Sequence, residues 1–304
     1  MESALFVNIS DIHVNYKNKD RVNNKLDELI KYLNVLSIEH KNIFLLVSGD
    51  IAYSGKREEY EYVYERFEKL AIKYNLILCP GNHDHDFSVY QSIVRNQLLK
   101  ADVDDLDGDS IELIIEGMSD YFVFEKSLKT FESYSENKLS KLYVFNIGER
   151  KVSITTLNSA WCSQRTEQGG SMLFPMKFFI EPPKCDIKIT MLHHPLSWFE
   201  PDNHKKLRNI LRENSNIVIT GHEHIADSLR IESTSNKCLM LEAMSFDDDW
   251  SQDNGFITFN FESNDVFIKK IKWKDGKFSD LDNIKQSEII KNNAIGTNNF
   301  FVNN

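Results

Sequence analysis

The strongest constraint on the fold is a repeated pattern in which a short apolar run ends directly at a polar cluster. Residues 4–9, 43–47 and 76–79 are β-compatible runs, and residues 22–36 and 60–70 between them carry apolar side chains three or four apart. This alternation of β and α segments predicts a sheet with parallel pairing that is covered by helices. In such sheets, functional groups gather beyond the carboxyl ends of the strands.

The second half of the chain is richer in β-compatible runs. They return at 152–157, 187–192 and 217–220, and shorter alternating runs follow at 238–242, 255–261 and 266–273. The last three predict consecutive antiparallel strands, which we expect to form a second sheet packed against the first. The sequence therefore favours an α/β fold, a two-sheet β-sandwich flanked by α-helices.

Two segments depart from this pattern. Residues 87–147 contain an acidic stretch and helical-looking segments, which predict a mainly helical insertion that caps or flanks the functional edge. From residue 276 the chain becomes polar and rich in asparagine. We expect one domain over 1–275, with its insertion at about 87–147, and a polar tail or linker over 276–304 that could lead to a partner domain or protein.

Composition narrows the class of partner. The 304 residues carry 36 Lys and Arg against 46 Asp and Glu, a net charge of −10, so binding to nucleic acid is possible but not indicated by charge. The first residues lack a signal-peptide pattern and no run approaches the roughly 18 apolar residues of a membrane span, so we expect a cytoplasmic protein without a membrane partner. The four cysteines are scattered, without the paired spacing of a zinc knuckle.

The polar clusters supply carboxylate, amide and imidazole groups but no thiolate. They are Asp11-Ile12-His13, Gly49-Asp50, Gly81-Asn82-His83-Asp84, His193-His194 and Gly221-His222-Glu223-His224. A mixed oxygen and nitrogen set of this kind suits divalent Mn, Fe or Zn. A lone carboxylate such as that of Asp50 can bridge two ions, and two ions about 3.5–4 Å apart can activate a water and hold the oxygens of a phosphoester.

In this order, the clusters resemble the calcineurin-like metallophosphoesterase superfamily, over residues 5 to about 245. The resemblance implies a two-sheet sandwich and two divalent metal ions. One ion would be held by Asp11, His13 and His224 and the other by Asn82, His193 and His222, with Asp50 bridging. It further implies that His83 contacts the phosphate and protonates the leaving oxygen, and that Asp84 orients His83.

The neighbouring pair His193-His194 leaves an ambiguity, because only one of them is needed as a ligand. The strand at 187–192 should deliver its first following residue, so we favour His193 and expect His194 either to support the metal ligands from behind or to face the substrate. His85 could line the same pocket, and Trp161 could stack on a base or sugar, although aromatic residues more often pack in cores. Arg165 could clamp a phosphate, although an exposed arginine without a role is the more common case.

These residues predict hydrolysis of a phosphodiester or phosphomonoester by attack of hydroxide held by the metal ions. The acidic net charge and the inserted cap favour a nucleotide-type substrate. One alternative is a nuclease acting on DNA or RNA. Another is a non-catalytic scaffold module that retains the fold, in which we would expect ligand positions to be lost; here all of them are filled.

Overall fold

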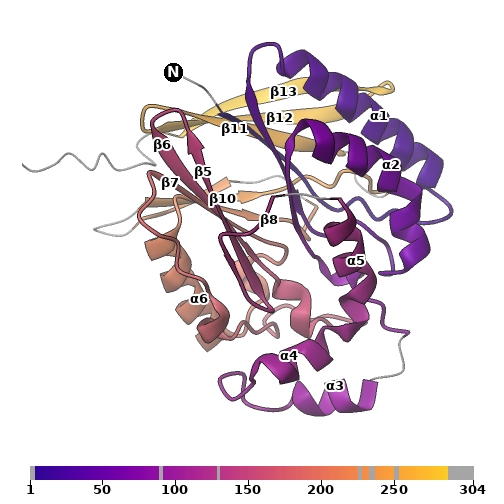
Figure 1. Ribbon diagram of the computed structural model, residues 1–304, viewed down its shortest axis with the longest axis vertical. Coiled ribbons are helices and arrows are strands. Elements are labelled where there is room, and N and C mark those ends of the chain that lie inside the picture. The colour runs from indigo at the N-terminus through magenta and orange to yellow at the C-terminus, as the bar shows by residue number, and fades with distance from the viewer. Residues whose placement is uncertain are drawn as a thin grey trace, which may run out of the picture.

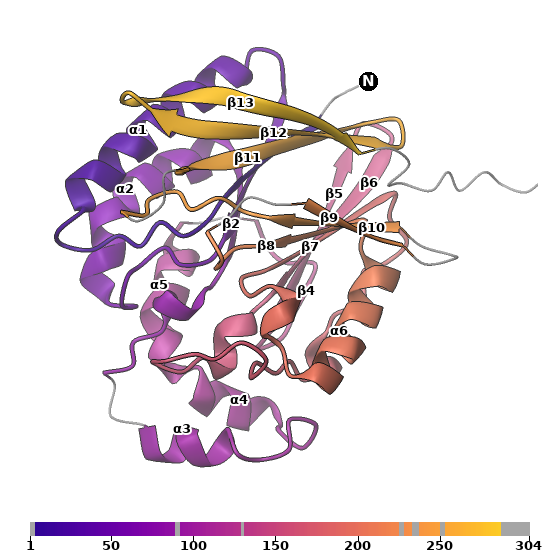
Figure 2. The same ribbon diagram turned by 180° about the vertical axis from the view of Figure 1, so that it is seen from behind.

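The computed structural model describes residues 4–88, 92–128, 131–224, 228–232, 237–249 and 253–286, and these form two mixed sheets packed face to face (Figures 1 and 2). The first sheet has the order β13 (Lys277–Gln286), β12 (Asp265–Lys274), β11 (Gly255–Glu262), β1 (Ala4–Ile9), β2 (Asn42–Ser48) and β3 (Asn75–Cys79). The second has the order β4 (Ser135–Glu136), β5 (Ser140–Ile147), β6 (Arg150–Leu157), β7 (Ile187–Leu192), β8 (Ile217–Thr220), β10 (Lys237–Glu242) and β9 (Ser228–Glu232).

Helices cover the outer faces of both sheets. The first sheet is covered by α1 (Lys19–Leu36), α2 (Arg57–Lys73) and α5 (Ser119–Ser127), and the second by α6 (Pro201–Asn214) (Figure 1). Two further helices, α3 (Ser92–Leu98) and α4 (Gly108–Ile114), lie together at one end of the molecule. The predicted α/β two-sheet sandwich is thus confirmed. Within the described ranges, no helix is both long and apolar enough to cross a membrane.

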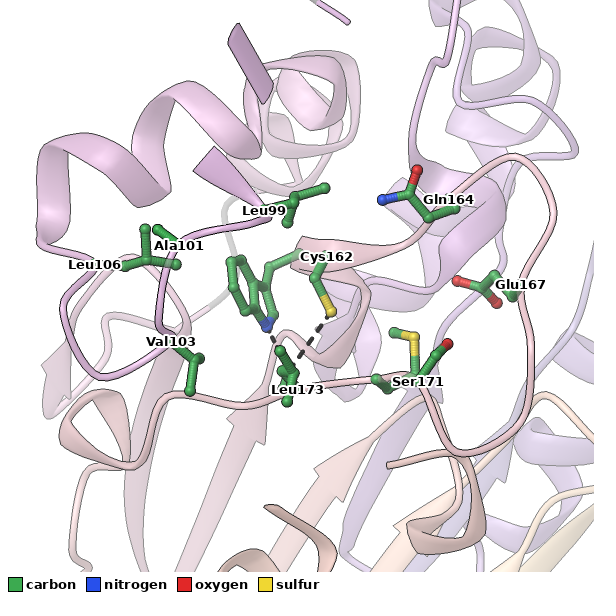
Figure 3. A pocket seen from close by; sticks show the side chains of 11 residues that line it. Leu99, Ala101, Val103, Leu106, Cys162, Gln164, Glu167, Ser171 and Leu173 are labelled. Carbon is green, nitrogen blue, oxygen red and sulfur yellow. Dashed lines mark hydrogen bonds between the residues drawn. The ribbon is translucent and has the colours of Figure 1, made fainter. Parts of the chain in front are cut away.

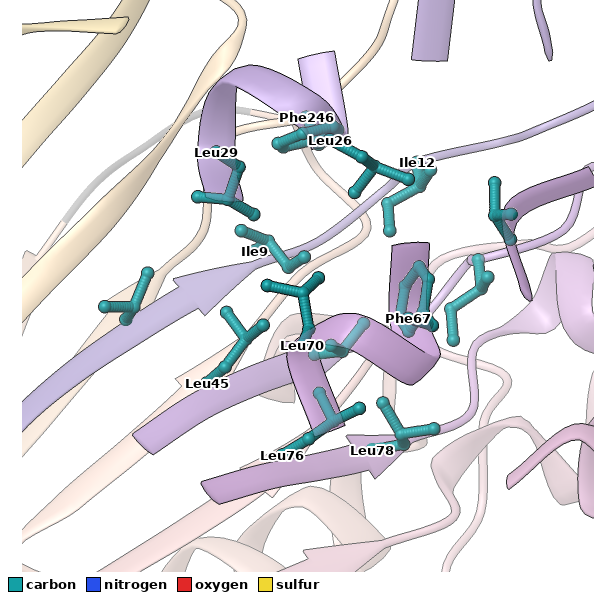
Figure 4. Packing of buried hydrophobic residues seen from close by; sticks show 14 of the residues in the cluster. Ile9, Ile12, Leu26, Leu29, Leu45, Phe67, Leu70, Leu76, Leu78 and Phe246 are labelled. Carbon is teal, nitrogen blue, oxygen red and sulfur yellow. The ribbon is translucent and has the colours of Figure 1, made fainter. Parts of the chain in front are cut away.

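The hydrophobic core has three layers, and they follow from the apolar patterns of the elements. Figure 4 shows the layer under α1 and α2, where Leu26, Leu29 and Phe67 pack against the strand residues Leu45 and Leu78. A second layer lies between the sheets, where Phe6, Phe44 and Ile77 meet Ile154, Ile189 and Ile219. A third lies under α6 and α4. Because both faces of the central strands are buried, they read as continuous apolar runs rather than as alternating ones.

The prediction that the C-terminal strands form the second sheet is confirmed for β10 but wrong for the strands after it. β11 pairs antiparallel with β1, so β11, β12 and β13 extend the first sheet. The second sheet is instead built from β4 to β10, with β6, β7, β8 and β10 in parallel register. Alternation identifies a strand but carries no information about which sheet edge it joins.

Two predicted boundaries also need correction. The last part of the predicted insertion, Ser140–Ile147, is β5, which forms a hairpin with β6 through Gly148, whose φ is 59°. The predicted tail is wrong for residues 277–286, which form β13; the turn before it uses Asp275 and Gly276 at φ 51° and 76°, the positive values that a tight Asp-Gly hairpin requires. The rest of that tail, residues 287–304, lies outside the described residues.

Candidate metal centre

The polar clusters meet where carboxyl ends of strands from both sheets face each other. The chain after β1 runs beside the chain after β2, with the Asp11 amide donating to the Gly49 carbonyl at 3.1 Å and the His13 amide to the Asp50 carbonyl at 3.0 Å. The amide of His222, which follows β8, donates to Asp11 Oδ2 at 3.2 Å and so links the second sheet to the first. The parallel topology therefore brings together clusters more than 200 residues apart.

One group of three potential ligand atoms comes from Asp11, His13 and His224. Asp11 Oδ1 and His224 Nε2 lie 3.2 Å apart, the two imidazole Nε2 atoms lie 3.3 Å apart, and His13 Nε2 lies 3.7 Å from Asp11 Oδ1. Atoms bound to one ion at about 2.1 Å are separated by about 3.0–3.4 Å. The group therefore fits a single divalent ion with only small adjustments.

A second group comes from Asn82, His193 and His222. Asn82 Oδ1 lies 2.9 Å from His193 Nε2 and 3.1 Å from His222 Nδ1, and these two nitrogens are 3.3 Å apart. An amide oxygen and two imidazole nitrogens in one triangle again have the spacing and the chemistry of a divalent metal site.

Asp50 stands between the two groups. Its Oδ2 lies 3.2 Å from His193 Nε2, in the second group, and 3.8 Å from His13 Nε2, in the first. Its Oδ1 accepts a hydrogen bond from the His83 amide at 2.8 Å, which fixes the carboxylate. Among the described residues, one buried carboxylate thus lies between two groups of potential ligand atoms.

The backbone at these positions is strained. Among the described residues, seven non-glycine residues have positive φ, and five of them are Asp11, His13, Asp50, His222 and His224. Such conformations are held only where the surrounding structure over-determines them, and they concentrate at functional sites.

The electrostatics of the centre divide its histidines into two kinds. Burial opposes charge on His193 and His224, but the carboxylate of Asp50 raises the pKa of His193 to about 10, and that of Asp11 raises the pKa of His224 to about 9. Burial lowers the pKa of His13 to about 4 and of His222 to about 3. Without metal, two imidazolium groups balance the carboxylates, and a divalent ion would replace their protons.

A buried oxygen without a well-aligned donor supports the same fit. Asp11 Oδ1 is buried and has no hydrogen bond of good geometry, and its close neighbours are the imidazole nitrogens His224 Nε2, at 3.2 Å, and His13 Nε2, at 3.7 Å. Buried carboxylate oxygens are normally satisfied, so an oxygen left in this state beside imidazole nitrogens fits a cation ligand.

Three of the four clustered imidazoles have a polar neighbour at their outward-facing nitrogen, whereas His13 Nδ1 is buried and has no hydrogen-bond partner. His193 Nδ1 lies 2.8 Å from the Ser48 carbonyl, and His224 Nδ1 lies 2.8 Å from Asp248 Oδ2. His222 Nε2 lies 4.0 Å from Glu167 Oε2. Partners of this kind fix the tautomer and orientation of a metal-binding histidine. Sequence reasoning missed Glu167 and Asp248; only the run of three aspartates at 247–249 could have drawn attention to the latter.

The hydrogen bonds of His194 distinguish it from His193. Ser159 Oγ accepts from the amides of His193 and His194 at 3.2 and 3.1 Å, so its own hydrogen is directed to His194 Nδ1, at 3.0 Å. His194 Nε2 therefore carries the ring proton and donates it to Glu167 Oε2 at 3.2 Å. Both nitrogens of this fully buried imidazole are thus engaged by the protein.

The prediction that Asp84 orients the His83 ring is wrong. The Asp84 carboxylate accepts from the amides of Ile51, Ala52 and Gly81 and from the Tyr60 hydroxyl, at distances of 3.3, 3.0, 2.9 and 2.9 Å. The His83 ring instead places Nδ1 2.6 Å from the Tyr53 carbonyl. In the short helical turn η1 (Asn82–Asp84), neighbouring side chains point in different directions, so Asp84 fixes the loop and Tyr53 fixes the ring.

The remaining predicted contacts lie beside the ligand groups rather than in them. Trp161 is buried, and its Nε1 donates to the Leu173 carbonyl at 2.7 Å. His85 is buried against Phe87, with ring centroids 4.3 Å apart, and lines a pocket of about 180 Å³ together with the exposed Arg165. None of the three belongs to the ligand groups found among the described residues.

The chain is similar in sequence to a bacterial protein and in fold to several solved structures. The chain is 25% identical over 259 residues to the uncharacterized metallophosphoesterase-like protein YydB of Bacillus subtilis (strain 168), a match that covers 79% of this chain and 52% of that protein. The chain thus spans about half the length of that relative. Similar solved structures include Vacuolar Protein Sorting 29 of Cryptosporidium parvum (14% identity, TM-score 0.42, covering 94% of this chain and 100% of that one). They also include a dimetal phosphatase of Danio rerio (12% identity, TM-score 0.47, covering 93% and 98%).

The family assignment rests on a match to a protein-family sequence model and not on the similar solved structures. The model described as calcineurin-like phosphoesterase matches residues 4–226, which include every clustered ligand group. The chain belongs to the calcineurin-like phosphoesterase family.

Proposed function

We propose that the chain is a dinuclear-metal phosphoesterase that hydrolyses a phosphodiester or phosphomonoester, with a nucleotide-type substrate preferred. The observation that supports this proposal is that Asp50 lies between two groups of three potential ligand atoms. Two divalent ions, Mn, Fe or Zn, would lower the pKa of a bound water and neutralise charge on the phosphoryl oxygens.

The distances support the following ligand roles. Asp11, His13 and His224 would hold one ion, and Asn82, His193 and His222 the other, with Asp50 between them. His193 is preferred over His194 because Nε2 of His193 faces Asn82. Both nitrogens of His194 are already engaged, by Ser159 and Glu167.

His83 would act on the leaving group. Its Nδ1 must carry a proton in order to donate to the Tyr53 carbonyl, so the imidazolium form has one further N–H, on Nε2. The ring lies next to that of His13, with centroids 4.6 Å apart, and so stands beside the first ligand group. From there Nε2 can contact a phosphoryl oxygen and donate its proton to the leaving oxygen.

Two alternatives remain open to experiment. A nuclease acting on DNA or RNA would use the same centre, but the net charge of −10 gives it no general attraction to a polyanion. A non-catalytic scaffold module would keep the fold and bind a partner. The chain spans about half the length of its Bacillus relative. We therefore also propose that a partner domain or protein could act together with this chain.

The test uses the purified chain loaded in turn with Mn, Fe and Zn. Hydrolysis of bis(4-nitrophenyl) phosphate and 4-nitrophenyl phosphate is measured for the wild type, for Asp50→Asn and for the exposed control Asp105→Asn. We expect hydrolysis by the wild type and the control and its loss in Asp50→Asn. No hydrolysis with any of the metals, or full activity in Asp50→Asn, would contradict the proposal, and the former result would favour the scaffold.

A further inference from the structure

A pocket of about 210 Å³ lies beside the candidate metal centre (Figure 3). One wall comes from the segment that joins α3 to α4 and the other from the segments around η3 (Ser159–Cys162) and Met172. Its apolar lining includes Leu99, Val103, Leu106, Trp161, Met172 and Leu173.

Hydrogen bonds hold both walls in place. The Trp161 indole donates to the Leu173 carbonyl at 2.7 Å, which closes one side of the pocket. Arg95 of α3 is buried, and its guanidinium donates to the carbonyls of Ile114, Trp161 and Ser163 at 3.0, 3.3 and 2.5 Å. These bonds tie the inserted helices to η3, so the pocket is formed before any ligand binds.

Glu167 connects this pocket to the metal centre. It is the one charged residue in the pocket lining, and its side chain is only 7% exposed. Its Oε2 accepts from His194 Nε2 at 3.2 Å and lies 4.0 Å from His222 Nε2. Its Oε1 is buried and has no hydrogen bond of good geometry, although the hydroxyl of Ser163, which has none either, lies beside the carboxylate. A buried carboxylate oxygen in this state favours a ligand that brings its own donor.

We infer that this pocket, which we call the Glu167 pocket, binds a planar, uncharged ring that carries an N–H or O–H donor, the class that includes the nucleobases. The volume of about 210 Å³ equals that of about seven waters, which is enough for one ring system. The donor would bond to Glu167 Oε1, while the apolar walls cover the ring and the carboxylate excludes anionic groups. The inference rests on the proposed function, since it places part of the same substrate beside the phosphoester.

The experiment measures binding of free rings to the zinc-loaded chain, with no phosphoester present. Adenine is titrated while the indole N–H signals of the tryptophans are followed by NMR, with Trp161 assigned by Trp161→Phe and Trp273 of β12 as the remote reference. Benzoate tests the exclusion of anions, and toluene tests the need for a donor. Val103→Phe fills the pocket, and Asp105→Phe adds the same ring at an exposed position of the same segment.

We expect adenine to shift the Trp161 signal but not that of Trp273. The shift should disappear in Val103→Phe and persist in Asp105→Phe, and Glu167→Gln should weaken binding by about tenfold. No shift with adenine, or equal binding of toluene that Glu167→Gln leaves unchanged, would overturn the inference. Binding without hydrolysis of any phosphoester would instead count against the proposed function, so the two failures can be told apart.

Discussion

The position of the Asp50 carboxylate between the two groups of potential ligand atoms depends on Gly81, which has no room for a side chain. A Cβ on Gly81 would lie 2.1 Å from Asp50 Oδ1 and 2.5 Å from the Asp50 amide nitrogen, distances that real Cβ atoms do not show. The backbone of Gly81 itself has an ordinary φ, so the substitution Gly81→Ala acts by contact alone. The carboxylate must move by roughly 1 Å, and a displacement of about 1 Å in a catalytic group can lower the rate by about 100-fold.

We therefore expect Gly81→Ala to hold fewer than two ions per chain and to hydrolyse bis(4-nitrophenyl) phosphate about 100-fold more slowly than the wild type. Metal content is measured by mass spectrometry of the purified protein, and cooperative thermal unfolding shows that the fold is retained. Gly108→Ala is the matched control, because a Cβ there meets nothing within 4 Å. Unchanged metal content and rate in Gly81→Ala would refute the view that the position of Asp50 is set by this contact.

Three further predictions concern the surroundings of the ligand groups. Asp248→Asn, which weakens the contact to His224, should lower metal affinity by about 10–100-fold in isothermal titration, while the exposed neighbour Asp249→Asn should not. Because the pKa values of His193 and His224 are raised to about 10 and 9, both hold protons at neutral pH. Metal must displace these protons, so zinc affinity should rise by up to about 100-fold per pH unit between about pH 7 and 9, and a flat profile would contradict this. Asp84→Asn should lower the free energy of unfolding, measured in urea, by about 2–3 kcal/mol, because it disrupts a carboxylate with four donors.

Much of the fold and of the centre could be predicted because both depend on local pattern. An apolar run long enough for a buried strand, followed at once by Asp11, Asp50 or His193, identifies a strand end, and parallel pairing brings those ends to one edge. The spacing of His222 and His224 alone could not separate their roles: His222 Nδ1 lies beside Asn82 and His193, whereas His224 Nε2 lies beside Asp11 and His13.

The rest could not be predicted because it depends on tertiary contacts or on weak patterns. β13 has few apolar residues, since it is an edge strand, and its sequence reads as a polar tail. Glu167 lies in an irregular segment, and only the folded chain brings it to His194. Asp84 and His83 are neighbours in sequence, yet the turn sends their side chains to different partners.

The central claim is that two ions share the carboxylate of Asp50. Anomalous diffraction from crystals of the manganese-loaded protein tests it directly, because each bound manganese gives its own peak. The structure predicts two peaks per chain about 3.5–4 Å apart, one beside Asp11, His13 and His224 and one beside Asn82, His193 and His222, with Asp50 between them. A single peak, or none at these side chains, would contradict the claim.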